Sequence, residues 1–113
     1  MTKAKLYDLQ QLIEIAAGNQ DFVDKMVNMF LEMTPALVSR IEAGIQLQDW
    51  DEVKSAAHKM KPSLDMMGID SLHDVIRSIE ENAKLVERLE DMPELYFTLS
   101  DTLDVVYQQL KAL

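Results

Sequence analysis

His58 is the residue of this chain best suited to chemistry, and three lysines lie close to it in the sequence. Lys54 precedes it by one helical turn, Lys59 follows it directly, and Lys61 comes about one turn later. Positive charge beside an imidazole favours its neutral, nucleophilic form and attracts an anion. The cluster therefore suits an anion such as a phosphoryl group, whose negative charge a lysine can balance. An exposed histidine without a function would have the same pattern.

The helix expected over residues 50–67 places His58 on its solvent side. Apolar residues recur there every three or four positions and form one buried face: Trp50, Val53, Ala57, Met60, Leu64 and Met67. On a helical wheel, His58 lies roughly 140° from the centre of that face. Lys54, Lys61 and Asp65 share its half of the helix, so the imidazole is expected to face water between two cations.

The rest of the chain is also helical in pattern, with few turn-forming residues. We expect a short helix over residues 9–17 and long helices over 19–46, 50–67, 70–90 and 92–112. Four expected N-caps are aspartates, and one left-handed C-cap is a glycine: Asp8, Asp49, Asp70, Asp91 and Gly68. These elements predict an all-α fold, an antiparallel four-helix bundle in up-down-up-down order with the short helix across one end. The whole chain, residues 1–113, is expected to form this single domain.

The helix over residues 19–46 carries an apolar stripe interrupted by Pro35, where we expect a kink or a break. The expected stripe contains Phe22, Met26, Met29, Phe30, Met33, Leu37, Ile41 and Ile45. Because each helix has one such stripe to bury, we expect no exposed apolar face and a monomer.

Composition excludes several classes of function. The net charge of −9 lacks the basic surface that nucleic acids and anionic membranes require. The absence of cysteine excludes disulfides, thiolate zinc sites and thiol catalysis. No window approaches the roughly 20 apolar residues that span a bilayer, and the residues after Met1 do not form a signal peptide. We therefore expect a cytoplasmic protein, and the start at Met1 favours a free one.

Other residue patterns do not support a metal or nucleotide site. Asp70 and His73 are spaced like half of a di-iron site, but no second copy and no inward carboxylates accompany them. The eight methionines are spaced like core residues. A glycine-rich phosphate loop is absent, so we expect no metal, no cofactor and no ATP site on this chain.

The stretch around His58 resembles the motif of histidine-containing phosphotransfer (HPt) domains, His-x-x-Lys-Gly-Ser with a glycine ten residues after the histidine. Here the motif reads His58, Lys61, Pro62, Ser63 and Gly68. The departure is Pro62 in place of glycine, which removes the helical donor for the His58 carbonyl. Small residues before the histidine and the bundle architecture fit the same family.

The resemblance implies a role for each matching residue. His58 would be the phosphoacceptor, attacking the aspartyl phosphate of a receiver domain through Nε2, and Lys61 would stabilise the phosphoryl charge. Gly68 would keep the surface low for a partner, with Pro62 beside the histidine. Lys54 and Lys59 are our additions to that partner surface, although ordinary solvated lysines would have the same pattern.

On the next helix, Glu80 and Lys84 are spaced so that they could face His58 and hold its Nδ1 atom. A plain surface ion pair between the two would explain them equally well.

The implied function is a phosphoryl carrier in two-component signalling, without autokinase activity. Its partners would be response-regulator receiver domains, a hybrid histidine kinase, or both, and Mg²⁺ would come with the receiver. The alternative is a helical adaptor that binds a signalling partner without phosphotransfer. The presence of both His58 and Lys61 favours the carrier, because an adaptor does not need this pair.

Overall fold

The computed structural model describes residues 4–113, and every regular element within them is helical. The α-helices are α1 (Gln10–Ala16), α2 (Gln20–Leu47), α3 (Trp50–Met66), α4 (His73–Leu85) and α5 (Met92–Lys111). Short 3-10 helices, η1 (Asp70–Leu72) and η2 (Leu89–Asp91), directly precede α4 and α5. The all-α prediction is therefore confirmed for the described part of the chain.

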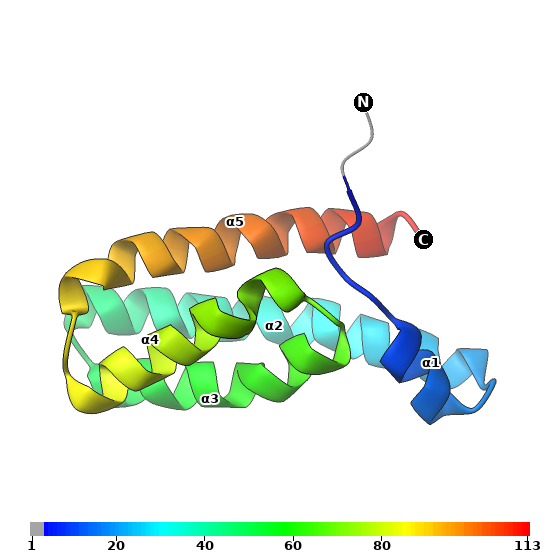
Figure 1. The fold of residues 1–113 in the computed structure, drawn as a ribbon, viewed down its shortest axis with the longest axis horizontal. Helices are drawn as coiled ribbons and strands as arrows, with labels where there is room; N and C mark the ends of the chain where they lie inside the picture. The colour runs from blue at the N-terminus through cyan, green and yellow to red at the C-terminus, as the bar shows by residue number, and fades with distance from the viewer. Residues whose placement is uncertain (1–3) are drawn as a thin grey trace.

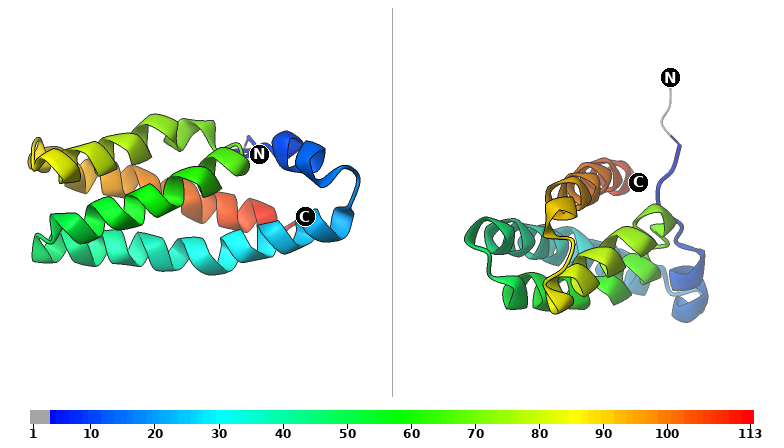
Figure 2. Two further views of the ribbon diagram at one scale, coloured as in Figure 1. Left: turned by 90° about the horizontal axis from the view of Figure 1, so that it is seen from below. Right: turned by 60° about the vertical axis from the view of Figure 1, so that its left-hand side comes forward.

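Helices α2 to α5 lie side by side, and α1 lies at one end beside the start of α2 (Figure 1). α3 packs against both α2 and α4, while α5 packs against α2 and α4. Figure 2 shows this helical bundle from two other sides. The core between the helices is apolar and takes residues from each of them, including Leu12, Ile41, Met60, Ile79 and Leu103. Burying these side chains holds α3 and α4 in register, which positions the residues around His58.

Helix starts follow the sequence expectations in part. Asp49 caps α3, because its side chain accepts a hydrogen bond of 3.2 Å from the Glu52 backbone N–H. Asp91 stands at the N-cap of α5 without a side-chain cap bond. Asp8 lies one residue before the N-cap of α1, where its side chain accepts from the Gln10 N–H at 2.9 Å. The expectation for Asp70 was wrong, since it is the first residue of η1 and makes no cap bond.

The helix expected over residues 70–90 is shorter than predicted. It begins with the 3-10 turn η1, and α4 ends at Leu85, where Val86 adopts a left-handed conformation with φ of 52°. Arg88 is left-handed too, with φ of 51°, and η2 follows it. These conformations reverse the chain so that Leu89 packs against the core and α5 can return along the bundle. The end of α4 therefore follows from the connection to α5 and was not predicted by local helix propensity.

The buried face of α2 differs from the predicted stripe by about one position. The buried residues are Val23, Val27, Phe30, Thr34, Ile41 and Gly44. Phe22, Met29 and Met33 are exposed, with 36%, 40% and 58% of their surface accessible. Apolar residues stand next to one another on this helix, as in Phe22–Val23 and Met26–Val27, so two adjacent stripes have the same spacing and periodicity alone does not choose between them. The expectation of no exposed apolar face was wrong.

Pro35 lies inside α2 without ending it. The helix runs unbroken for 28 residues, so of the two expected outcomes the break is absent, and the kink stays a prediction. Proline removes one backbone donor and displaces the carbonyl four residues earlier. The helix that contains Pro35 packs against both α3 and α5.

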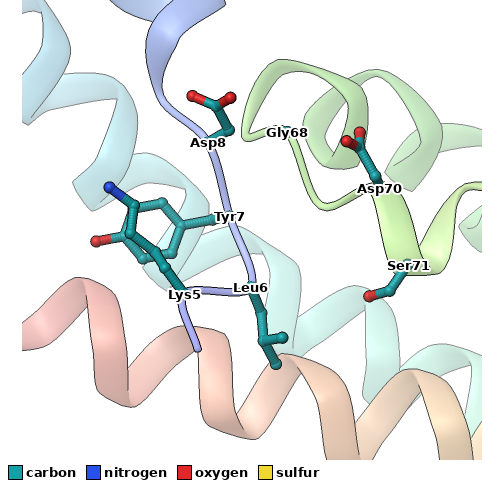
Figure 3. A pocket seen from close by; sticks show the side chains of 7 residues that line it. All are labelled: Lys5, Leu6, Tyr7, Asp8, Gly68, Asp70 and Ser71. Carbon is teal, nitrogen blue, oxygen red and sulfur yellow. The ribbon is translucent and has the colours of Figure 1, made fainter. Parts of the chain in front are cut away.

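The segment before α1 crosses the end of the bundle and contacts the end of α3 (Figure 3). The Asp8 N–H donates to the Met67 carbonyl at 2.9 Å, and the Leu6 N–H donates to Oε1 of Gln109 at 3.0 Å. Tyr7 between them is buried. These bonds tie the start of the described chain to α3 and α5.

Candidate functional site

His58 projects from the middle of α3 into solvent, as the helical wheel predicted. Its side chain is 70% exposed. The residues that hold it there are on the opposite side of the helix, where Val53, Ala57, Met60 and Leu64 are buried. Ala56 is buried as well, so α3 packs closely on both flanks of the face opposite His58. The imidazole is therefore accessible to a second protein on a helix that the core keeps in place.

Glu80 on α4 contacts the ring of His58 and the amine of Lys61 together. Its Oε2 atom lies 2.6 Å from Nδ1 of His58, and its Oε1 atom lies 2.7 Å from Nζ of Lys61. The carboxylate accepts both hydrogen bonds, so Nδ1 of His58 carries a proton. The lone pair of Nε2 then points away from α4 toward solvent. Nε2 is therefore the ring nitrogen that this carboxylate leaves free.

The surroundings of Glu80 keep it ionised. Burial by itself would raise the pKa of its carboxyl group. The hydrogen bonds from Lys61 and His58, together with their positive charge, outweigh that effect and lower the pKa from its ordinary value of 4.5. Glu80 is consequently a carboxylate at neutral pH and can balance positive charge that develops on the His58 ring.

The four lysines singled out in the sequence have different positions. Lys61 is only 25% exposed and lies against Glu80. Lys84 lines the same shallow pocket as His58, Lys61 and Glu80, a hollow of about 450 Å³ between α3 and α4. Lys54 lies half-buried one turn before His58. Lys59 is exposed on the side of α3 nearer to α2. The structure thus brings Lys61 and Glu80 together with His58, and places Lys84 at the edge of that cluster.

Pro62 and Gly68, the other two motif positions, have separate surroundings. Pro62 is exposed on α3 one turn after His58, and the helix continues through it to Met66. Gly68 lies past the end of α3, about 15 Å along the helix from His58 by helical rise. Its φ is +63°, and an added Cβ would lie 2.4 Å from the Asp8 carbonyl oxygen. Gly68 is therefore required by the backbone conformation at this position and by the close passage of Asp8, and its place in a partner surface stays a prediction.

An apolar groove on the other side of His58 was missed in the sequence. It lies between α2 and α3, has a volume of about 550 Å³, and is bordered by Lys59 and Ser63 of α3. Its walls are mainly apolar side chains of α2 and α3: Met26, Met29, Phe30, Met33, Leu37, Met66 and Met67. The signal for it was the position of Met29 and Met33, which lie one residue before the buried Phe30 and Thr34 and so form a second apolar line along α2. His58 thus stands on a crest between a charged pocket and an apolar groove.

A second charged cluster continues from the pocket along the same two helices. Arg77 donates to Oδ2 of Asp65 at 3.0 Å, and Nδ1 of His73 lies 3.6 Å from Oδ1 of Asp65. Of the two readings of Glu80, the contact with His58 is the one in the structure, together with the contact with Lys61. Asp70 is separate from this cluster and lines the pocket beside Gly68. No group of three or more potential metal ligands occurs in residues 4–113.

Comparison with protein families identifies the chain. It matches the family described as the Hpt domain over residues 25–112, which include α3, α4, α5 and most of α2. The chain therefore belongs to the Hpt domain family, as the motif around His58 predicted. Members of this family are phosphocarriers of two-component phosphorelays, without ATP sites of their own, and they interact with receiver domains and kinases.

Comparisons with curated proteins and with solved structures found no match. Within residues 4–113, the helices lack the length and apolar character needed to cross a membrane.

Proposed function

We propose that this protein carries a phosphoryl group on His58 between response-regulator receiver domains. The observation that carries the proposal is the contact of 2.6 Å between Glu80 and Nδ1 of an otherwise exposed His58. A carboxylate on Nδ1 leaves Nε2 free to act as a nucleophile, and a surface histidine without a function needs no such partner. The cation of Lys61 beside the same carboxylate supports the proposal.

The transfer is a substitution at phosphorus. The Nε2 lone pair of His58 attacks the phosphorus of an aspartyl phosphate on the receiver, and the bond between phosphorus and the aspartate oxygen breaks. The receiver keeps a carboxylate, and His58 gains a phosphoryl group while its Nδ1 retains the proton. The ring becomes positively charged in this step, and Glu80 stabilises that charge. Lys61 balances the charge of the phosphoryl oxygens. The reverse reaction passes the group to another receiver.

The partner surface in this proposal is the crest of α3 with the groove beside it. Pro62 and Lys59 lie next to His58 on the crest, and Lys54 lies one turn away. A receiver whose aspartyl phosphate reaches Nε2 must cover this part of α3, so the apolar groove edged by Lys59 falls within its footprint. Apolar contact at such a groove provides affinity that the small reacting atoms cannot supply.

The bundle topology belongs to the same proposal. An antiparallel four-helix bundle in up-down-up-down order, formed by α2 to α5, is supported by the contacts of α3 and α5 with α2 and α4. We propose that this bundle, with α1 at one end, is a single domain over the whole chain. No nucleic acid or membrane partner is included, because the net charge is −9.

Phosphotransfer from a receiver domain tests the proposal. A panel of receiver domains is phosphorylated with acetyl phosphate, freed of reagent, and mixed with the full chain. Label that is labile to acid and stable to alkali should then be found on the protein. His58→Gln should abolish this label, and His73→Gln, which alters the other histidine of the chain, should retain it. Label that persists in His58→Gln would overturn the site. Absence of label with every receiver would favour the alternative, a helical adaptor that binds a signalling partner without phosphotransfer.

A further inference from the structure

Ionisable residues of α3 and α4 face each other at three successive levels. His58 lies opposite Glu80 at the first level, with 2.6 Å between Nδ1 and Oε2. Asp65 lies opposite His73 at the third, with 3.6 Å between Oδ1 and Nδ1. Lys61 and Arg77 occupy the level between them, because each stands three residues from the first pair and four from the third. Helix α4 runs back along α3, so this middle level sets two cations against each other (Figure 1).

Each of the two cations is held by a carboxylate on a different side. Lys61 contacts Glu80 on the side of His58, at 2.7 Å. Arg77 contacts Asp65 on the far side, at 3.0 Å. It also donates to the His73 carbonyl at 3.1 Å and lies 3.0 Å from Nδ1 of the His73 ring. Like charges at facing positions disfavour one another unless counter-charges separate them. The guanidinium of Arg77 is therefore held beside Asp65, about two helical turns along α3 from His58.

Arg77 has open access to His58 from this position. It lines the same hollow as His58, Lys61, Glu80 and Lys84. Three residues along α4 separate Arg77 from Glu80, an axial distance of about 4.5 Å that an extended arginine side chain covers. Both ends of its present ion pair are partly exposed, at 36% for Arg77 and 46% for Asp65. Such a pair contributes little and exchanges readily for a stronger partner.

We infer that Arg77 is a phosphate-binding residue of the phosphorylated protein, and that Asp65 holds it in reserve when His58 is free. A phosphoryl group carries close to two negative charges and three acceptor oxygens, so it attracts a guanidinium more strongly than one exposed carboxylate does. The fork of arginine donors matches phosphoryl oxygens, which a lysine at this position would contact as a point charge. This inference rests on phosphorylation of His58, the proposed function.

Titration of the phosphoryl group by phosphorus NMR tests the inference. The full chain is phosphorylated with phosphoramidate, and the midpoint of the phosphoryl ionisation is measured for the wild type, Arg77→Gln and Arg77→Lys. A bound cation favours the dianion, so Arg77→Gln should raise the midpoint by roughly half a pH unit, and Arg77→Lys should restore part of the difference. Arg88→Gln removes the same charge from a pocket lined by α4 and α5 residues and should leave the midpoint unchanged.

A double-mutant cycle isolates the role of Asp65. When Arg77 is present, Asp65→Asn should clearly lower the midpoint of the phosphoryl ionisation, because it releases Arg77. In the Arg77→Gln background the same substitution should lower this midpoint much less. Circular dichroism establishes that each variant is folded. Equal midpoints for folded wild type and Arg77→Gln would overturn the inference while leaving the proposed function intact. If His58 takes no phosphoryl group from phosphoramidate or from any receiver, the proposed function fails and the inference fails with it.

Discussion

The imidazole of His58 donates its Nδ1 proton to Glu80, a residue 22 positions later on the neighbouring helix, over 2.6 Å. The same carboxylate receives the amine of Lys61. One side chain of α4 therefore contacts both the imidazole of His58 and the amine of Lys61. The predictions below begin with this carboxylate.

Replacing Glu80 with glutamine should slow phosphotransfer to His58 about tenfold. The amide keeps the shape but loses the charge that stabilises the developing imidazolium, and a hydrogen bond to a charged group is worth about 1.5–3 kcal/mol. The rate of phosphotransfer is measured by mixing each variant with a phosphorylated receiver and quenching the reaction at a series of times. The ring nitrogen shifts of His58 in NMR should also move toward a mixture of tautomers. A variant with wild-type ring shifts and a slow rate would mean that Glu80 does not act through the ring.

The pH dependence of stability should carry the signature of Glu80. Its pKa is lowered in the folded protein despite burial, so the unfolded chain binds more protons at the carboxyl group around its ordinary value of 4.5. The stabilisation is therefore complete above that value and is lost as the pH falls through the lowered pKa. Urea unfolding of wild type and Glu80→Gln should show a difference that shrinks from about pH 5 to about pH 3. Glu81→Gln is the matched control, and an equal trend in both variants would contradict the assignment.

Alanine at Gly68 should destabilise the fold more than alanine at Gly18. Both glycines have positive φ, at +63° and +88°, so each substitution carries the left-handed penalty of about 1–2 kcal/mol. A Cβ at Gly18 meets nothing within 4 Å, whereas at Gly68 it would lie 2.4 Å from the Asp8 carbonyl oxygen. Overpacking adds about 1–3 kcal/mol at that position. Denaturant unfolding of the two variants measures the difference, and equal losses would show that the Asp8 contact carries no weight.

Serine at Met33 should weaken receiver docking without destabilising the bundle. Met33 is 58% exposed on the wall of the groove beside Lys59, so its side chain contributes little to the folded core. Burial against a partner would be worth about 1 kcal/mol, or roughly a fivefold change in affinity. Calorimetric titration with a receiver that transfers to His58 measures the effect. Phe97→Ser, at an exposed apolar residue of α5, should bind like the wild type. Equal loss in both variants would argue against the groove.

Local sequence patterns predicted much of the fold and the key site residues. Helical spacing predicted the all-α class and the exposure of His58. Spacing together with the capping residue types predicted the start and end of α3 and the cap at Asp49. The four-residue spacing of Glu80 and Lys84 singled out the carboxylate that does contact the ring, but also Lys84, which does not contact Glu80. Whether α4 turned Glu80 toward α3 depended on packing between helices, which the spacing within one helix does not determine.

The features that sequence reasoning missed all depend on contacts between distant segments. The end of α4 at Leu85 follows from the return of the chain toward α5, and the requirement for Gly68 follows from the crossing of Asp8. The groove was hidden because the valine stripe and the methionine stripe of α2 have the same period. The ion pair of Asp65 and Arg77 joins α3 and α4, whose axial alignment depends on how they pack in the core.

The location of the phosphoryl group in the phosphorylated protein tests the central claim most directly. Long-range proton–nitrogen NMR of the full chain, phosphorylated with phosphoramidate, identifies the histidine and the ring nitrogen that carry phosphorus. The structure predicts a phosphoryl group on Nε2 of His58, with the Nδ1 proton retained and hydrogen-bonded to Glu80. Phosphorus on Nδ1 of His58, or on His73 in place of His58, would contradict it.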